Sequence, residues 1–200
     1  EILRCLVGSE MCIRDRISRK DAVSTTWSGG TTTEFYLFPR DGSYKERRFD
    51  LRISSATVDL EASDFTLLPD YQRIITPLEG GFTLTYKETG EKVTLAPLEE
   101  DFFDGAYHTH SIGKAIDFNV MYKKGMHAAY SVINASKKFG LADFRFLYVP
   151  FIDAKDLTGS TLNEHSLTRD TLYVSDDRSD AFVLALKKPV SLIYVSVRKA

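Results

Sequence analysis

The sequence predicts an all-β protein, and three observations support this prediction. Val, Ile and Thr number 40 of 200 residues, and Phe, Tyr and Trp number 24. About a third of the chain therefore consists of residue types that suit a pleated, half-buried strand. From residue 23 onward, apolar residues recur in short alternating runs that turn residues separate. Over the same region, no 12-residue window shows the apolar stripe of an amphipathic helix.

Turn residues bound the strands expected in the first half of the chain. Pro39 ends the first strand, and the glycines at 80 and 81 end the third. Gly90 connects two alternating runs as a hairpin. In the run before it, Phe82 and Leu84 share a face because alternate residues of a strand point the same way. The expected strands are residues 35–38, 49–60, 73–78, 82–86, 92–95 and 115–122.

The second half of the chain shows the same pattern. Residues 134–141 are expected to form a turn of helix, and residues 153–169 a polar loop with a short helix. Many short strands at regular spacing favour a sandwich or a barrel. Gly125 divides the chain from residue 23 onward about equally, which is compatible with two similar β modules. The expected strands of this half are residues 129–133, 144–152, 171–175, 181–186 and 191–198.

Charge and composition exclude several classes of protein. The net charge is -2, from 26 basic and 28 acidic residues, which gives no support to nucleic-acid or membrane binding. No apolar stretch approaches the roughly 20 residues of a membrane span. The N-terminal region also lacks the apolar run of a secretory signal, so a cytoplasmic location is expected.

Residues 1–16 differ in character from the rest and hold both cysteines, Cys5 and Cys12. They show no strand alternation and resemble translated adapter sequence, so they are expected to be an artefactual or disordered extension. No function is assigned to the cysteines, and no disulfide framework is expected elsewhere.

The first candidate ligand site is the segment 27–34, which contains the only Trp of the chain. Adjacent glycines allow another group to approach the backbone closely. Hydroxyl groups and backbone amides beside an aromatic ring are suited to holding a small polar ligand. The alternative is a turn at the start of a strand with the Trp in the core. The candidate residues are Trp27, Gly29, Gly30, Thr32, Thr33 and Glu34.

The second candidate group lies on the polar faces of expected strands. Arg52 and Ser54 share one face of their strand, and Asp117, Asn119 and Met121 share one face of theirs. In a barrel, a polar face that points inward lines a cavity, and the planar guanidinium group suits carboxylates. Arg73 is a further candidate for the same role. The alternative is a solvent-facing sheet surface with weak ion pairs.

A metal site is the weaker hypothesis. His108 and His110 are two residues apart, so on a strand both imidazoles could bind one ion. The residues that follow supply no carboxylate at the spacing a metal-binding cupin uses. No nucleophile elbow and no phosphate-binding glycine loop is present either, so no catalytic residue and no cofactor is assigned.

Six segments in this order and spacing resemble the HutD/Ves family of bacterial cupin-like proteins. The resemblance is close over about residues 22–125 and extends to the C-terminal part only through its strand pattern. The segments are 27–34 (WSGGTTTE), 49–56 (FDLRISSA), 65–69 (FTLLP), 78–80 (LEG), 103–105 (FDG) and 117–121 (DFNVM).

This resemblance implies a bicupin, that is, two barrels of double-stranded β-helix type, with residues 17–125 in the first and 126–200 in the second. It also implies a cytoplasmic protein that depends on no metal and has no firmly assigned enzymatic activity. The ligand proposed for the family is a small carboxylate of histidine utilisation, such as urocanate or a formylated glutamate. A homodimer is compatible with the resemblance. Many members have Asn at the position of Ser28 and Arg at that of Thr33, so Arg52 or Arg73 would bind the anion here.

The leading hypothesis is therefore a non-catalytic binder of an anionic metabolite. Arg52 and Arg73 would pair with its carboxylate, Trp27 would cover its planar part, and Asp117 and Asn119 would orient it. The alternatives are a metal-dependent cupin enzyme that uses His108 and His110, and a structural or protein-interaction β module.

Overall fold

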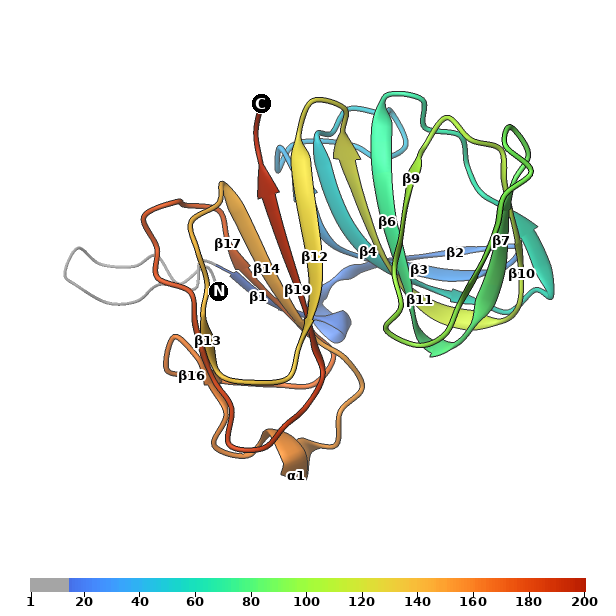
Figure 1. Ribbon diagram of the computed structural model, residues 1–200. Coiled ribbons are helices and arrows are strands. Elements are labelled where there is room, and N and C mark those ends of the chain that lie inside the picture. Colours follow the sequence, from blue (N-terminus) through green and yellow to red (C-terminus); the bar gives the residue numbers. More distant parts are fainter. Residues whose placement is uncertain (1–14) are drawn as a thin grey trace. The chain divides into compact units, whose positions relative to one another are not determined.

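The computed structural model describes residues 15–200 and confirms the all-β class (Figure 1). The chain forms two compact units. The N-terminal unit comprises Ala22–Gly125, and the C-terminal unit comprises residues 15–21 together with Met126–Ala200. The described part contains one α-helix, α1 (Ala154–Leu157), and one 3-10 turn, Arg19–Asp21. No helix within residues 15–200 is both long and apolar enough to cross a membrane.

The N-terminal unit consists of two antiparallel sheets. The larger has the strand order β2-β3-β4-β11-β6-β9, and the smaller has the order β5-β10-β7-β8. In Figure 1, β3, β4, β6, β9 and β11 form one wall of this unit, and β7 and β10 lie in the facing wall. The strands are β2 (Val23–Trp27), β3 (Gly30–Phe38), β4 (Leu51–Val58), β5 (Ala62–Asp64), β6 (Tyr71–Gly80), β7 (Phe82–Tyr86), β8 (Lys92–Leu95), β9 (Asp101–Asp104), β10 (Thr109–Ile112) and β11 (Ala115–Lys123).

The C-terminal unit also consists of two antiparallel sheets. Their strand orders are β1-β17-β14-β19-β12 and β13-β18-β15-β16. The strands are β1 (Asp15–Ser18), β12 (His127–Ile133), β13 (Lys137–Lys138), β14 (Phe144–Val149), β15 (Thr161–Leu162), β16 (His165–Ser166), β17 (Thr171–Ser175), β18 (Val183–Ala185) and β19 (Leu192–Arg198).

The two units share one topology. The larger sheets contain the orders β4-β11-β6-β9 and β12-β19-β14-β17. If the four strands of each order are numbered along the chain, both orders read first, fourth, second, third. The smaller sheets, β5-β10-β7-β8 and β13-β18-β15-β16, also match strand for strand. Such a repeat is what a two-barrel bicupin requires, and β14 therefore corresponds in position to β6.

Each expected strand corresponds to a strand of the structure, and three have the expected bounds: β7, β8 and β17. The prediction of a helical turn at 134–141 is wrong, because Lys137 and Lys138 form β13 and pair with β18. Residues 17–21, which were expected in the first barrel, belong to the C-terminal unit because β1 pairs with β17. Asp15 and Arg16, placed in the extension, are part of that pairing, whereas Cys5 and Cys12 lie outside the described residues.

The core of the N-terminal unit lies between its two sheets. Ile75 and Ala115 of the larger sheet pack in one apolar cluster with Phe82 and Leu84 of the smaller sheet. The face of β6 and β11 that carries Ile75 and Ala115 is therefore the inner face. Because alternate residues share a face, Arg73, two positions from Ile75, also points inward.

The core of the C-terminal unit is built in the same way. Leu147 and Val149 of β14 pack in one cluster with Leu162 of β15 and Leu184 of β18. These four side chains are almost completely buried. The face of β14 that carries Leu147 and Val149 is therefore the inner face. Arg145, two positions before Leu147, lies on this face as well.

Candidate functional site

Three neighbouring strands place polar side chains side by side on the inner face of the larger sheet. β11 lies between β4 and β6, and Met121 is registered with both Arg52 and Arg73. Two positions along β11, Asn119 is registered with Ser54. This register brings polar residues of β4, β6 and β11 together, and Glu34 of β3, which is registered with Ser54, joins them. We call this group the polar cluster; it comprises Glu34, Arg52, Ser54, Arg73, Asp117, Asn119 and Met121.

Arg52 is buried and well partnered. Its Nε donates to Glu34 Oε2 at 2.6 Å, which is a charge-assisted hydrogen bond. Its Nη1 donates to Ser54 Oγ at 3.1 Å and lies 3.9 Å from Met121 Sδ. Its guanidinium carbon stands 4.1 Å from the centre of the Tyr44 ring. Glu34 therefore balances the charge of Arg52 within the cluster.

Arg73 is equally buried but has no such partner. Only 5% of its surface is exposed, and its Nε has no hydrogen-bond partner within residues 15–200. Its guanidinium carbon lies 4.7 Å from the ring centre of Phe65 and 5.1 Å from that of Phe103. Burial lowers the pKa of Arg73 to about 10, and the positive charge of Arg52 acts in the same direction. Arg73 thus remains a cation at neutral pH, next to two aromatic rings and with its Nε–H unpaired.

Asn119 and Asp117 complete the inner surface. The Oδ1 of Asn119 is buried and has no hydrogen-bond partner in the described chain. Oδ1 of Asp117 accepts a hydrogen bond from the amide of Ala56 at 3.0 Å. The negative charge of Asp117 also raises the pKa of Arg73, against the larger effect of burial. The cluster therefore presents one unpaired donor and one unpaired acceptor at its centre.

Two side chains outside the expected site cover the arginines. Tyr44 belongs to the loop between β3 and β4, and Phe65 follows β5. Burial raises the pKa of Tyr44, but its hydrogen bond with Arg47 and the positive charge of Arg52 outweigh this effect and leave the pKa lowered. Thr66, which follows Phe65, also lowers the pKa of Tyr44, so the two covering segments lie near each other. A ligand can reach the guanidinium groups only if this cover moves.

Sequence reasoning did not assign Tyr44, Phe65 or Phe103 to the site. Phe65 and Phe103 lie within segments 65–69 and 103–105, which carry the family resemblance, and that signal could have identified them. Nothing in the loop between β3 and β4 distinguishes Tyr44, because its position over Arg52 depends on the path of the whole loop.

The segment that contains Trp27 lies away from the arginines. Trp27 pairs with Gly30 at the turn between β2 and β3, and Gly30 pairs with Val58, six positions along β4 from Arg52. Six positions of a strand correspond to about 20 Å. Trp27 is 39% exposed, and its indole Nε1 donates to Thr32 Oγ1 at 3.2 Å. In this structure Trp27 does not cover Arg52, and it is not a core residue either.

The two glycines of this turn are explained by close contacts. A Cβ on Gly29 would come within 2.0 Å of the Trp27 ring. A Cβ on Gly30, where φ is +151°, would come within 1.8 Å of the Thr57 carbonyl oxygen. Gly29 and Gly30 therefore permit the hairpin to pack against β4.

Thr33 and Glu34 point to opposite faces of β3. Glu34 is registered with Ser54 and binds Arg52, so it faces the cluster. Thr33 is registered with Ser55 on the other face, where its hydroxyl pairs with that of Ser24 at 3.0 Å. A side chain at position 33, whether Thr or Arg, therefore projects away from the polar cluster.

The two histidines bind different carboxylates. His108 Nδ1 lies 2.6 Å from Glu88 Oε1, and His110 Nδ1 lies 3.0 Å from Asp64 Oδ1. These side chains are largely exposed. Among residues 15–200, no group of three His, Cys, Asp or Glu side chains is placed to hold a metal ion.

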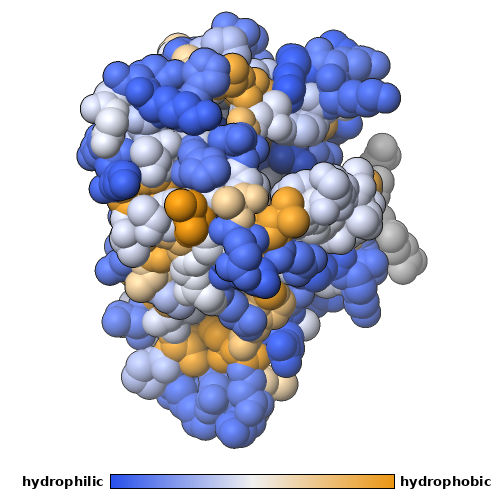
Figure 2. Space-filling model, turned by 90° about the vertical axis from the view of Figure 1, so that its right-hand side faces the viewer, coloured by the Kyte–Doolittle hydropathy of each residue, from blue (hydrophilic) through white to orange (hydrophobic). Residues whose placement is uncertain are grey.

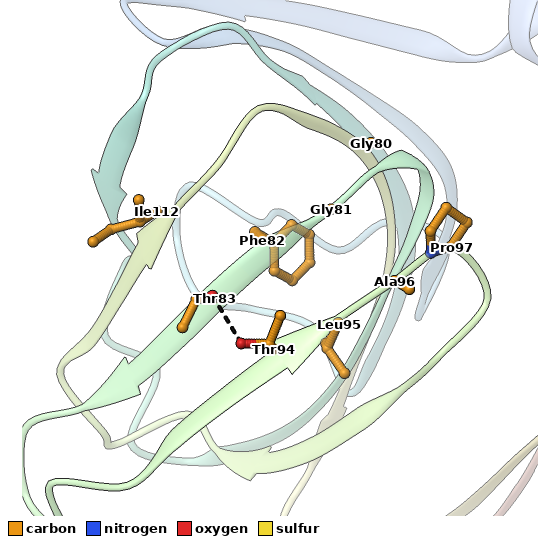
Figure 3. A pocket seen from close by; sticks show the side chains of 9 residues that line it. All are labelled: Gly80, Gly81, Phe82, Thr83, Thr94, Leu95, Ala96, Pro97 and Ile112. Carbon is orange, nitrogen blue, oxygen red and sulfur yellow. Dashed lines mark hydrogen bonds between the residues drawn. The ribbon is translucent and has the colours of Figure 1, made fainter.

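A hollow of about 370 Å³ lies apart from the polar cluster, beside β7 and β8 (Figure 3). Gly80, Phe82, Leu95 and Ile112 are among its lining residues, and the hydrogen bond between Thr83 and Thr94 crosses it. It is open and presents no charged side chain. Figure 2, which looks onto one side of the molecule, shows hydrophobic areas that hydrophilic side chains separate.

Comparison with known protein families identifies the family of this chain. A family model described as HutD matches residues 19–192. The chain belongs to the HutD family. The match spans both units, including the C-terminal one, where the sequence resemblance rested on strand pattern alone. No curated protein sequence matches the chain.

Solved structures confirm a cupin-like fold for this HutD-family chain. HutD from Pseudomonas fluorescens SBW25, in a formate condition, has 21% identity and a TM-score of 0.76 over 93% of this chain and 98% of that one. A conserved protein of unknown function from Pseudomonas aeruginosa PAO1 has 22% identity and a TM-score of 0.76, over 92% and 98%. The pirin YhhW of Escherichia coli, in complex with nickel(II), has 10% identity and a TM-score of 0.64, over 93% and 99%.

Proposed function

We propose that this HutD-family protein binds a small carboxylate metabolite in its N-terminal unit, without catalysing a reaction. The observation that carries the proposal is Arg73, a buried cation whose Nε–H has no acceptor within the described chain. An unpaired buried charge is costly, and proteins retain one where a ligand completes it. A carboxylate supplies both the negative charge and the acceptor oxygens that a guanidinium group binds best.

The residues around Arg73 define what the ligand must offer. Arg52 already has Glu34 as a partner, so it contributes a positive field and its remaining donors. The unpaired Oδ1 of Asn119 requires a donor, such as an N–H or O–H group of the ligand. Phe65 and Phe103 provide aromatic faces for a planar or apolar part. A small molecule with a carboxylate at one end and a hydrogen-bond donor at the other matches this surface.

Two metabolites of histidine utilisation fit this description, and we propose them as first candidates. Urocanate carries a carboxylate on a planar chain that ends in an imidazole N–H. A formylated glutamate carries carboxylates and an amide N–H. Membership of the HutD family supports this choice of pathway, in which the protein would moderate flux or expression by sequestering a metabolite.

The first test is a ligand screen with the full chain. Urocanate, N-formylglutamate, histidine and simple dicarboxylates are titrated by calorimetry, and the melting temperature is followed in parallel. A ligand that binds only the folded state raises the melting temperature by mass action. We expect at least one carboxylate to bind the wild type and Arg73→Met to weaken it by about tenfold or more, the equivalent of about 1.4 kcal/mol.

The control variant is Lys92→Met. Lys92 lies in the same unit, is exposed on β8 and is registered with Thr85, so its loss removes a positive charge without touching the cluster or the loop that carries Tyr44. Lys92→Met should bind as the wild type does, and Arg52→Ala should weaken binding in the same direction as Arg73→Met. The proposal fails if no carboxylate binds, or if Arg73→Met and Lys92→Met bind equally well.

A further inference from the structure

The C-terminal unit contains a buried arginine of its own. Arg145 on β14 is completely buried. Its Nη2 donates to Ser175 Oγ and to the Asp177 carbonyl oxygen, both at 2.8 Å. Its Nε and Nη1 have no hydrogen-bond partner within residues 15–200. Three N–H bonds of a fully desolvated guanidinium group, one on Nε and two on Nη1, are therefore without an acceptor.

The surroundings of Arg145 are mainly aromatic rings and hydroxyl groups, not a directly paired carboxylate. Of the carboxylates in the described chain, none forms an ion pair with it. The Asp180 carboxylate accepts from Ser175 Oγ at 3.3 Å and is thus separated from Arg145 by the hydroxyl. The guanidinium carbon stands 5.4 Å from the ring centre of Phe182, which in turn packs 6.1 Å from that of Tyr194. The environment therefore consists of hydroxyl groups and aromatic rings, with one carboxylate, that of Asp180, bridged to Arg145 through Ser175 Oγ.

Arg145 corresponds in topological position to Arg73. β6 and β14 are the equivalent strands of the two units, each next to the last long strand of its larger sheet. Both arginines stand near the start of their strand, point inward and contact Phe rings. The sequences around Arg73 and Arg145 are not similar, yet both arginines occupy the same inward-facing position. This repeated position indicates that the inward orientation of Arg145 has a function.

We propose that Arg145 forms a second anion site, in the C-terminal unit, for an oxyanion of the size of formate. An unpaired buried cation with free donors is completed by negatively charged oxygen atoms. The complete burial of Arg145 limits the ligand to a small one. The loop between β17 and β18 closes over the guanidinium group through the Asp177 carbonyl, and its opening would admit the anion. Arg145 binds its anion independently of whether Arg73 binds one.

The test follows the Nε–H signal of Arg145 by NMR in the full-length, isotope-labelled chain. Triple-resonance experiments connect this signal to the Arg145 backbone, so assignment requires no variant. Sodium formate is added, with sodium chloride at equal ionic strength as the control and sodium phosphate as a larger oxyanion. We expect a saturable shift of the Arg145 signal in formate, and a much smaller, unsaturated response in chloride and in phosphate.

Two variants separate this site from the proposed N-terminal one. Arg73→Lys should leave the formate response of the Arg145 signal unchanged. In Arg145→Lys, the backbone amide signals of β14 and β17 report on the C-terminal unit, and we expect their formate response to require at least tenfold more formate than in the wild type. A saturable Arg145 response to formate, in a protein that binds none of the screened metabolites, would leave this site standing while the N-terminal proposal fails. An Arg145 signal that moves equally in formate and chloride, or not at all, shows an adventitious ion or a buried water and overturns the second site.

Discussion

Arg73 is a cation placed where water does not reach, and its cost to the fold can be measured. The lowering of its pKa from 12.5 to about 10 corresponds to about 3 kcal/mol of unfavourable free energy for the charged form. Contacts with Phe65 and Phe103 compensate in part. A residue that destabilises the folded state in this way is typical of a binding site, where stability is given up for function.

This cost predicts that Arg73→Met, which weakens binding, stabilises the ligand-free protein. Met fills a similar volume without a charge, so we expect the free energy of unfolding to rise by about 1–3 kcal/mol at pH 7. For a chain of this size, each kcal/mol raises the melting temperature by about 2–4 °C. Urea denaturation at several pH values measures the effect.

The pH dependence has a defined sign. Because the pKa of Arg73 is lower in the folded than in the unfolded state, the unfolded chain binds more protons between about pH 10 and 12.5. The stability of the wild type relative to Arg73→Met should therefore rise as the pH rises through 10. A variant that is less stable than the wild type at pH 7 would mean that Arg73 is a structural residue.

At the scale of elements, the hairpin of β2 and β3 depends on Gly30. A Cβ at this position would meet the Thr57 carbonyl at 1.8 Å, and the backbone at φ +151° disfavours any other residue. We expect Gly30→Ala to lower the free energy of unfolding by roughly 2–4 kcal/mol. Trp27, the only tryptophan of the chain, lies on this hairpin and supplies the fluorescence signal.

The matched control is Gly90→Ala, in the turn between β7 and β8. Gly90 also has a positive φ, +72°, but nothing lies within 4 Å of a Cβ added there. We therefore expect Gly90→Ala to lower the free energy of unfolding only by the conformational cost of a positive φ, about 1 kcal/mol. Equal losses of stability for Gly30→Ala and Gly90→Ala would show that the close contact with Thr57 is not the reason why the hairpin needs Gly30.

The strands also show which features of the fold the sequence pattern can predict. Strict alternation located long strands such as β4 and β11 and placed Arg52, Asp117 and Asn119 on the faces that turn out to be polar and buried. Alternation cannot find strands of two residues such as β13, because two residues carry no period. It also cannot show which strands are neighbours, and only the register of Met121 brings Arg52 and Arg73 together.

At the scale of the molecule, the same strand order occurs twice although no repeat is visible in the sequence. Pairing of two strands requires a hydrophobic face and a defined register, and many different sequences meet these requirements. The two units can therefore keep the same topology without sequence identity. Residue type alone did not show the close contacts of Gly29 and Gly30 or the hydrogen bond of Trp27 to Thr32, and the ligand roles of these three residues stay a prediction.

Arg19 lies close in sequence to Ala22, where the N-terminal unit begins, and a partly buried network fixes its segment to the C-terminal unit. Arg19 Nε donates to Asp170 Oδ2 at 2.7 Å, and the Tyr148 hydroxyl donates to Asp170 Oδ1 at 2.6 Å. Burial raises the pKa of Tyr148, and the hydrogen bond to Asp170 acts in the same direction, so the hydroxyl remains a donor at neutral pH. Asp170 thus joins β14 to the segment that follows β1.

Removing the charge of Asp170 should therefore loosen the C-terminal unit. Asp170→Asn keeps the size of the side chain and suits the backbone, where φ is +51°, so it isolates the loss of charge. We expect a loss of about 1–3 kcal/mol and faster hydrogen exchange of β14 and β17 amides. Asp156→Asn, which breaks an exposed pair with Lys188 at 3.0 Å, should change stability by less than about 0.5 kcal/mol. If both variants behave alike, the network around Asp170 does not hold β1 and β14 together.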